Sequence, residues 1–254
     1  SALPADLGIA IVVVVHLDPF HPSELASILE KQTAMRVVQV EERMSLEPNT
    51  VYVIAPNRQL VISDSSIDTR PFTEARGRRS PIDDFLCSLA EQHGDGFAIL
   101  LSGGGSDGAL GVKAIRERGG LILVQDPNEA EQPSMPRHAI ANGPDFILPV
   151  KQIAAQLSEL VLTKGYLASG AFADGDTETL QKILNRVRIK TGQDFSRYKQ
   201  PTVLRRITRR MQVTQTLTMN DYLELLSKSE TEPQALMQDL LISVTSFFRD
   251  PAAF

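Results

Sequence analysis

The feature that most restricts the fold of this chain is an alternation, through about residue 162, of short β-branched runs with helix-like segments. Four runs have the continuous apolar character of strands buried on both faces, and they lie at residues 9–15, 51–55, 97–102 and 121–125. Segments with apolar residues at helical spacing lie between and after them, at residues 22–31, 81–92, 109–118 and 150–162. This alternation predicts a doubly wound α/β domain built around a mostly parallel sheet.

The pattern changes after residue 162. Glycine, serine and alanine are frequent in residues 163–176, which predicts a linker. Beyond it, the segments with helical periodicity are residues 177–190, 199–213, 218–228 and 231–243, and no run there resembles a strand. A length of 254 residues fits two domains. We therefore expect an α/β domain at residues 1–162 and a small all-α domain at residues 177–254.

Composition and charge exclude several classes of protein. A net charge of −5 argues against general nucleic-acid binding, which depends on Lys and Arg neutralising phosphates. The single cysteine, Cys87, rules out an intramolecular disulfide framework and a multi-cysteine metal site, and it fits a reducing cytoplasm. The longest strongly apolar run, residues 9–15, is far shorter than the roughly 20 residues that cross a bilayer. We expect a cytoplasmic protein without membrane insertion.

A glycine loop at residues 101–108, between a predicted strand and a predicted helix, is the segment most suggestive of chemistry. Its glycines match the dinucleotide-binding pattern G-x-G-x-x-G, and Asp126 follows at a distance suited to a ribose-binding acid. However, such a loop usually follows the first strand of its domain, and Asp107 would place a carboxylate beside the pyrophosphate. Nucleotide binding is therefore disfavoured.

The same loop also matches the G-x-S-x-G pattern of a nucleophile elbow, with Ser106 as the candidate nucleophile. A hydrolase of that type needs a histidine further along the chain, and His138 is the only one after Ser106. The alternative is that Ser106 or Asp107 caps the helix that begins near residue 109. From spacing alone, the helix cap is the favoured interpretation.

His16 follows the first predicted strand, where α/β folds place functional groups. The segment His16-Leu17-Asp18-Pro19, the glycine loop and the segment Met135-Pro136-Arg137 occur in this order over about residues 1–162. In order and spacing they resemble the catalytic domain of the chemotaxis receptor methylesterase family. That family hydrolyses glutamate methyl esters on chemoreceptors with a Ser-His-Asp triad and no cofactor. The resemblance implies that His16 is the base and Asp107 the orienting acid.

The resemblance also identifies two departures and a missing part. Gly104 occupies the family's oxyanion-donor position, where Met is usual, and Val15 replaces the Gln that commonly precedes the histidine. A backbone N–H donor tolerates the first change. The Gly-Ala-Ser turn that carries the nucleophile is not in this sequence, so we expect an N-terminally truncated sheet and no hydrolysis by this chain alone. A non-catalytic signalling module that only binds partners is the rival interpretation.

The second part, about residues 177–254, resembles the helical N-terminal domain of the chemotaxis receptor methyltransferase family. The motifs that carry this resemblance are Thr191-Gly192-Gln193-Asp194-Phe195, Tyr198-Lys199, Arg205-Arg206-Ile207, Arg209-Arg210-Met211 and residues 243–254. That family transfers a methyl group from S-adenosylmethionine to receptor glutamates. Matched to its motif, Thr245 and Arg249 become cofactor contacts, and Arg249 is suited to the methionine carboxylate. We expect this site to be incomplete in the chain.

One helix of this part carries a cluster of arginines, and at about 100° per residue these arginines share one face. Its members are Arg205, Arg206, Arg209 and Arg210. We expect this face to contact an acidic protein surface, and the resemblance favours the helical bundle of a chemoreceptor. Nucleic acid is disfavoured as the partner because neither stacking aromatics nor a nucleic-acid motif accompanies the cluster.

Overall fold

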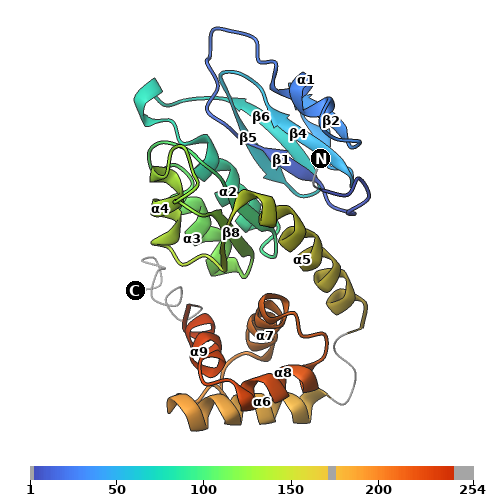
Figure 1. Cartoon of the computed structure of the whole chain (residues 1–254), viewed down its shortest axis with the longest axis vertical. Helices are drawn as coiled ribbons and strands as arrows, with labels where there is room; N and C mark the ends of the chain where they lie inside the picture. Colours follow the sequence, from blue (N-terminus) through green and yellow to red (C-terminus); the bar gives the residue numbers. More distant parts are fainter. Residues whose placement is uncertain (1–2, 171–175, 243–254) are drawn as a thin grey trace. The chain divides into compact units, whose positions relative to one another are not determined.

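The structure is a computed structural model that describes residues 3–170 and 176–242. It divides into two compact units, residues 1–158 and residues 159–254 (Figure 1). The first unit contains sheets and helices, and the described part of the second contains helices alone. The predicted class, α/β followed by all-α, is confirmed.

Two parallel sheets form the framework of the first unit. In one, β4 (Thr50–Ile54) lies between β1 (Ile11–Val13) and β2 (Arg36–Val40). In the other, β8 (Leu121–Gln125) lies between β7 (Phe97–Leu100) and β9 (Phe146–Leu148). Every residue of the two central strands is buried, as their unbroken apolar character predicted. The four predicted strands are therefore confirmed, although β1 and β7 are shorter than predicted and β4 begins and ends one residue earlier.

An antiparallel sheet that the sequence analysis did not predict completes this unit. It contains β3 (Met44–Ser45), β5 (Arg58–Ser63) and β6 (Ser66–Pro71), and β6 pairs with both of the others. A two-residue turn joins β5 to β6, and Asp64 has the positive φ of 53° that such hairpin turns require. Leu60, Ile62 and Ile67 are buried in alternation with more exposed neighbours, which is the pattern of a sheet with one solvated face.

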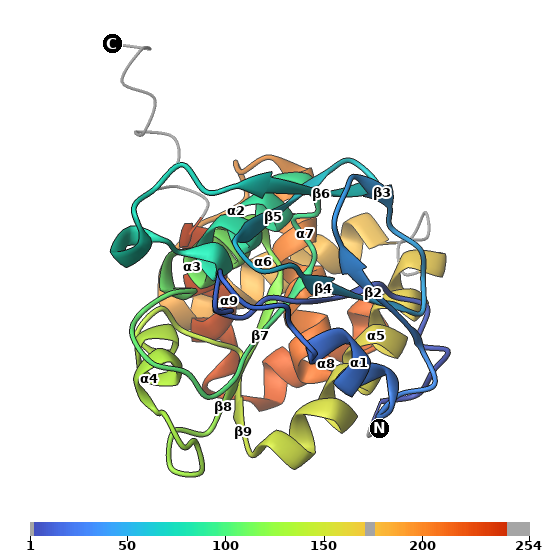
Figure 2. The same ribbon diagram turned by 90° about the horizontal axis from the view of Figure 1, so that it is seen from above.

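Helices pack against these sheets. The helices α1 (Leu25–Glu30), α2 (Pro81–Gln92), α3 (Ala109–Arg118) and α4 (Ser134–Ile140) belong to this unit, with a short 3₁₀ turn at Arg76–Arg78 before α2. The packing of α3 and α4 on β7 and β8 can be followed in Figure 2. Gly111 lets α2 and α3 approach closely, because a Cβ atom there would lie 2.4 Å from Leu86 Cβ. The predicted helix at residues 22–31 is shorter in the structure.

The helix α5 (Val150–Gly170) overturns part of the linker prediction. Residues 163–170 continue this helix instead of forming a linker. Glycine is a poor helix former, but its penalty of about 1 kcal/mol is offset where the helix buries apolar side chains. Leu167 is such a side chain, since it is buried in the hydrophobic core of the second unit.

The remaining helices agree with the sequence analysis to within two residues at each end. They are α6 (Asp176–Thr191), α7 (Gln200–Thr214), α8 (Met219–Lys228) and α9 (Glu232–Ile242). The core between them includes the fully buried Ile183, Ile207, Tyr222 and Leu240. Thr218 caps α8 by accepting the Asp221 N–H at 3.1 Å.

Candidate active site

The structure brings His16 and Asp107 together. His16 lies in the segment after β1, and Asp107 ends the glycine loop before α3. His16 Nε2 lies 2.9 Å from Asp107 Oδ2. The histidine side chain is 54% exposed and the carboxylate 8%, so the imidazole faces solvent while the acid is fixed beneath it. This is the arrangement of a base and its orienting acid.

The first turn of α2 fixes the Asp107 carboxylate. Oδ1 accepts the Asp83 N–H at 2.9 Å, and Oδ2 accepts the Ile82 N–H at 3.1 Å. A helix N-terminus has unpaired N–H groups and a partial positive charge, so a carboxylate there is stabilised. Asp107 therefore caps α2, a helix that precedes it in the chain, and does not cap α3 as the sequence analysis considered.

The contact with Asp107 also determines which imidazole nitrogen is available for chemistry. A carboxylate only accepts hydrogen bonds, so His16 Nε2 is assigned the proton and neutral His16 presents Nδ1 as the acceptor. A nucleophile that loses its proton to His16 must approach Nδ1. This is the reverse of the chymotrypsin arrangement, in which the aspartate holds Nδ1.

Asp83 is a supporting residue that the sequence analysis missed. Its Oδ1 accepts the Gly111 N–H at 2.7 Å, so a residue of α2 stabilises the start of α3. Burial raises the pKa of the Asp83 carboxyl above its ordinary value, and the nearby Asp107 charge raises it further, while the Gly111 N–H opposes the increase. The sequence showed only that an acid lies in the first turn of α2. That this acid accepts an N–H group of α3 depends on how the two helices pack.

The glycine loop presents the N–H of Gly104 to solvent. Gly103 donates its N–H to Gln132 O at 2.9 Å and accepts the Met135 N–H at 3.0 Å. Gly105 O accepts hydrogen bonds from Ser134 Oγ at 3.0 Å and His138 Nδ1 at 3.1 Å. Gly104 itself is exposed, and its N–H makes no hydrogen bond with any described residue. The loop is therefore fixed on both sides of Gly104, and the Gly104 N–H is among its donors that make no hydrogen bond within the described residues, as an oxyanion donor requires.

Two side chains that were not singled out hold the start of this loop. Buried Gln125, at the end of β8, accepts the Ser102 N–H at 2.8 Å. Ser102 Oγ in turn accepts the Gln132 N–H at 3.0 Å. His138, to which no role was assigned, lies on α4 and donates from Nδ1 to two carbonyl oxygens, Gly105 O and Ser134 O. These contacts connect α4 and β8 to the loop.

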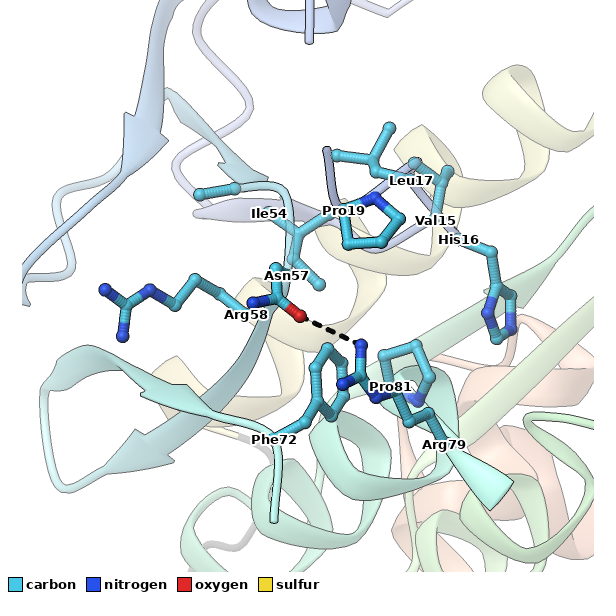
Figure 3. Close-up of a pocket in the computed structure, with 11 residues that line it drawn as sticks. Val15, His16, Leu17, Pro19, Ile54, Asn57, Arg58, Phe72, Arg79 and Pro81 are labelled. Carbon is cyan, nitrogen blue, oxygen red and sulfur yellow. Dashed lines mark hydrogen bonds between the residues drawn. The ribbon is translucent and has the colours of Figure 1, made fainter. Parts of the chain in front are cut away.

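A pocket of about 220 Å³ opens beside His16 (Figure 3). Its walls are largely apolar, and Val15, which replaces the glutamine common in the family, is one of its lining residues. The polar side chains that line it besides His16 are Asn57, Arg58 and Arg79. The candidate base therefore borders a space large enough for a side chain of another protein.

The geometry disfavours both rival interpretations of the glycine loop. The N–H groups that a phosphate would need are partly occupied, because Gly103 donates to Gln132 and Gly111 donates to Asp83. Ser106 is exposed, and its hydroxyl makes no hydrogen bond to a histidine within the described residues. His138 Nδ1 is used as a donor, so it cannot serve as the base for Ser106 at that nitrogen.

The predicted exposed arginine face of α7 is wrong. Arg206 and Arg209 are buried, and only Arg205 is exposed. Arg209 Nη1 pairs with Asp239 Oδ2, and Arg210 donates from Nε and Nη2 to the two carboxylate oxygens of Glu232 at 2.8 and 2.6 Å. Both acids lie on α9, and their charges make burial of the arginines tolerable. The arginines of α7 have no acids interleaved with them in their own helix. Their acidic partners lie on α9 instead.

Burial and the charges of this cluster shift two pKa values in the second unit. Burial alone would lower the pKa of Arg210, but the hydrogen bonds and charge of Glu232 raise it above its ordinary value. Burial raises the pKa of Tyr222, whose hydroxyl donates to Glu232 Oε1 at 2.7 Å. We therefore expect both groups to keep their protons at neutral pH.

Neither a metal site nor a membrane span was found in the described residues. No group of three or more His, Cys, Asp or Glu side chains there is arranged to hold a metal ion. Within residues 3–170 and 176–242, no helix combines the length and the hydropathy needed to span a bilayer. Thr245 and Arg249, the residues expected to contact S-adenosylmethionine, lie outside the described residues.

Comparison with known proteins relates each unit to a family. The sequence profile of the CheB methylesterase matches residues 1–157, and that of the CheR methyltransferase all-alpha domain matches residues 178–241. The crystal structure of the Thermotoga maritima CheB methylesterase catalytic domain superposes with a TM-score of 0.57 and 26% identity. It covers 62% of this chain, and the chain covers 87% of that domain.

Two relatives show how these parts occur elsewhere. A putative protein-glutamate methylesterase/protein-glutamine glutaminase of Leptospira interrogans is 37% identical over 60% of this chain and 80% of its own length. An uncharacterised 104.1 kDa protein of Rhodobacter capsulatus is 36% identical over 91% of this chain, so the similarity extends into both parts. The chain spans only 27% of the length of that relative. More than half of the chain matches one profile, and the chain therefore belongs to the CheB methylesterase family, followed by a helical region that matches the all-alpha domain of CheR methyltransferases.

Proposed function

We propose that the first unit is the greater part of a protein-glutamate methylesterase catalytic domain that removes methyl groups from receptor glutamates. In this proposal His16 is the general base, Asp107 orients it, and the Gly104 N–H stabilises the oxyanion. The observation that carries the proposal is the 2.9 Å contact between His16 Nε2 and Asp107 Oδ2 at the edge of an open pocket. The family to which the chain belongs supplies the reaction class.

The geometry suits a two-step ester hydrolysis. A serine hydroxyl transfers its proton to His16 Nδ1 and attacks the ester carbonyl, and the resulting oxyanion accepts the Gly104 N–H. The tetrahedral intermediate collapses, and His16 returns the proton to the departing methoxy group. Methanol departs, and an acyl-enzyme remains. Water, deprotonated by His16, then attacks the acyl-enzyme, and His16 returns the proton to the departing serine oxygen as the glutamate is released. Asp107 remains ionised and stabilises the imidazolium in both steps.

The described residues contribute the base, the acid and the donor, but no serine hydroxyl that hydrogen-bonds to His16. We propose that the nucleophile is the serine of the Gly-Ala-Ser turn that the family carries upstream of the part present here. A chain without that turn is then inactive, and a chain that includes it is an esterase.

The second unit extends the proposal to the parent protein. A match to the CheR all-alpha domain supports a parent that also transfers methyl groups from S-adenosylmethionine to receptor glutamates, in chemotaxis or a related sensory adaptation. Thr245 and Arg249 remain the predicted cofactor contacts, and Arg205 is the one arginine of the predicted partner face that stays exposed. A methylated chemoreceptor bundle is the proposed partner of both activities.

Methanol release from a methylated receptor tests the esterase proposal. The chain is compared with a version extended upstream to include the Gly-Ala-Ser turn, and with the extended version carrying His16→Gln. We expect release from the extended chain alone, because Gln cannot take the proton of the serine. If the folded extended chain releases no methanol, the non-catalytic signalling module becomes the better account.

A further inference from the structure

Arg79 is held in a fixed position in the wall of the pocket beside His16. It lies just before α2, and its guanidinium carbon is 4.5 Å from the centre of the Phe72 ring. Its Nη1 donates to Asn57 Oδ1 at 2.9 Å (Figure 3). Its Nε donates to Glu74 O at 3.2 Å. Stacking on an aromatic ring and two hydrogen bonds reduce the number of conformations available to a long side chain.

The hydrogen-bond partners of Arg79 are all neutral. An amide oxygen and a backbone carbonyl take two of its donors, and no described side chain hydrogen-bonds to Nη2. Glu74 interacts with the charge of Arg79, but its side chain is exposed and accepts a hydrogen bond from Thr73 Oγ1 instead of from the guanidinium. Arg210 of the second unit differs, because its Nε and Nη2 both donate to the carboxylate of Glu232. Arg79 thus has a fixed positive charge and a free pair of donors.

The rest of the pocket restricts what can reach this guanidinium. Apolar side chains form most of the wall, including Val15, Ile54 and Pro81. Arg58 also lines the pocket, but its guanidinium points away from Arg79 and His16 in Figure 3. A volume of about 220 Å³ is below the roughly 300 Å³ at which small-molecule sites usually begin, and it suits one or two side chains of a protein.

We propose that this pocket binds the carboxylate of an acidic side chain that neighbours the methylated glutamate in the substrate protein. The aliphatic part of that side chain lies against the apolar wall, and the carboxylate accepts hydrogen bonds from Arg79. This inference rests on the proposed function, because it places the scissile ester beside His16. It makes Arg79 a specificity-determining residue that selects esters with an acidic neighbour.

Binding of two peptides to three forms of the protein tests the inference. Two helical peptides carry one glutamate γ-methyl ester, with Glu or Gln one helical turn away. We expect the wild-type chain to bind the Glu peptide about tenfold more tightly than the Gln peptide, measured as dissociation constants by fluorescence anisotropy. Arg79→Gln should abolish this ratio. Arg78→Gln is the matched control, since Arg78 is exposed and does not line the pocket, and it should keep the ratio.

Several results would overturn the inference. These are a ratio near one for the wild-type chain, no binding of either peptide, or an unchanged ratio in Arg79→Gln. Should Arg79→Gln disturb the loop, the salt dependence of the wild-type ratio decides the question. A charge pair must weaken as the salt concentration rises from about 0.05 to 0.5 M. If the ratio of the two dissociation constants does not change with salt, a charge pair with Arg79 is excluded.

Methanol release by the upstream-extended chain separates this inference from the proposed function. Release from both peptides at equal rates and equal affinities overturns the acidic-neighbour inference and leaves the esterase intact. Acid-dependent binding without any methanol release supports the pocket and overturns the esterase. Release that favours the Glu peptide in wild type and Arg78→Gln, but not in Arg79→Gln, supports both.

Discussion

His16 and Asp107 in the first unit, and Arg210 and Glu232 in the second, are both pairs of titratable side chains joined across two structural elements. The first pair leaves the histidine 54% exposed, whereas the second leaves its arginine 13% and its glutamate 8% exposed. Asp107 is held by backbone N–H groups of α2 and has one side-chain partner. Glu232 is surrounded by Arg210 and the Tyr222 hydroxyl.

The two pairs differ in whether nearby hydrogen-bond donors and acceptors already have partners. This separates a candidate reactive site from a structural cluster. In the second unit Arg209 and Arg210 are each paired with an acid of α9, so these two ion pairs join α7 to α9. In the first unit, Nδ1 of His16 and the N–H of Gly104 remain available on fixed supports. The same kinds of residue can therefore stabilise a fold or prepare a reaction.

The strongest test of this comparison is Asp107→Asn in the upstream-extended chain. We expect the rate of methanol release to fall about 10⁴-fold, because Asn no longer selects the tautomer of His16 that can accept a proton. The free energy of unfolding should fall by only about 1 kcal/mol, because the Asn oxygen can still accept the Asp83 N–H while the amide nitrogen cannot accept the Ile82 N–H. The measurements are initial rates of release and urea unfolding.

The matched control for that substitution is Asp126→Asn. Asp126 Oδ1 accepts the Asn128 N–H at 2.9 Å and does not contact His16, so methanol release should stay at the parent rate. Activity of Asp107→Asn within tenfold of the parent would show that the His16–Asp107 contact is structural, like the pairs of the second unit.

Asp239→Ala tests the structural side of the comparison. It removes the carboxylate that pairs with Arg209, whose side chain is 2% exposed, and leaves a buried charge poorly compensated. We expect a loss of about 3–5 kcal/mol in the free energy of unfolding of the second unit. Urea unfolding followed by circular dichroism, with hydrogen exchange in α7 and α9, measures it.

Glu224→Ala is the control for that loss. Glu224 pairs with Lys228 on the surface of α8, and both side chains are mostly exposed. Removing an exposed pair should change the free energy of unfolding by less than about 1 kcal/mol. Equal effects of the two substitutions would contradict a special role for the buried cluster.

The smallest expected effect concerns Asp83, which lies directly behind the candidate active site. Because burial raises its pKa in the folded state, folded Asp83 holds its proton more tightly than unfolded Asp83. The free energy of unfolding should therefore fall as pH rises from its ordinary pKa, near 3.8, through the raised pKa. Asp83→Asn should remove this fall and gain less than about 1 kcal/mol at neutral pH, while keeping a bond from Gly111 N–H.

Urea unfolding of the first unit at a series of pH values measures that effect. Asp83→Ala serves as the comparison, because it also removes the cap on α3 and should be about 1 kcal/mol less stable than Asp83→Asn at every pH. If the pH dependence of Asp83→Asn matches that of the parent chain, the raised pKa contributes nothing to stability.

The sequence by itself determined the strongly periodic elements and the residues of the candidate site. Helices α2 and α3 begin and end where the pattern predicted, because Pro81 favours a helix start and Gly119, with φ of 101°, ends α3. Strands β4 and β8 were visible as continuous apolar runs. His16, Gly104 and Asp107 were named from local motifs and their resemblance to the methylesterase family, since each lies in a segment with its own signature.

Only the tertiary structure decided which groups those residues meet. No local pattern indicates that Asp107 caps α2, that Asp83 caps α3, or that Arg209 and Arg210 find acids on α9. The hairpin of β5 and β6 and the continuation of α5 through Gly170 were missed for the same reason. Periodicity reports how each segment buries its own apolar face, whereas the partner of a buried charge or an unpaired N–H is fixed by the packing of distant segments.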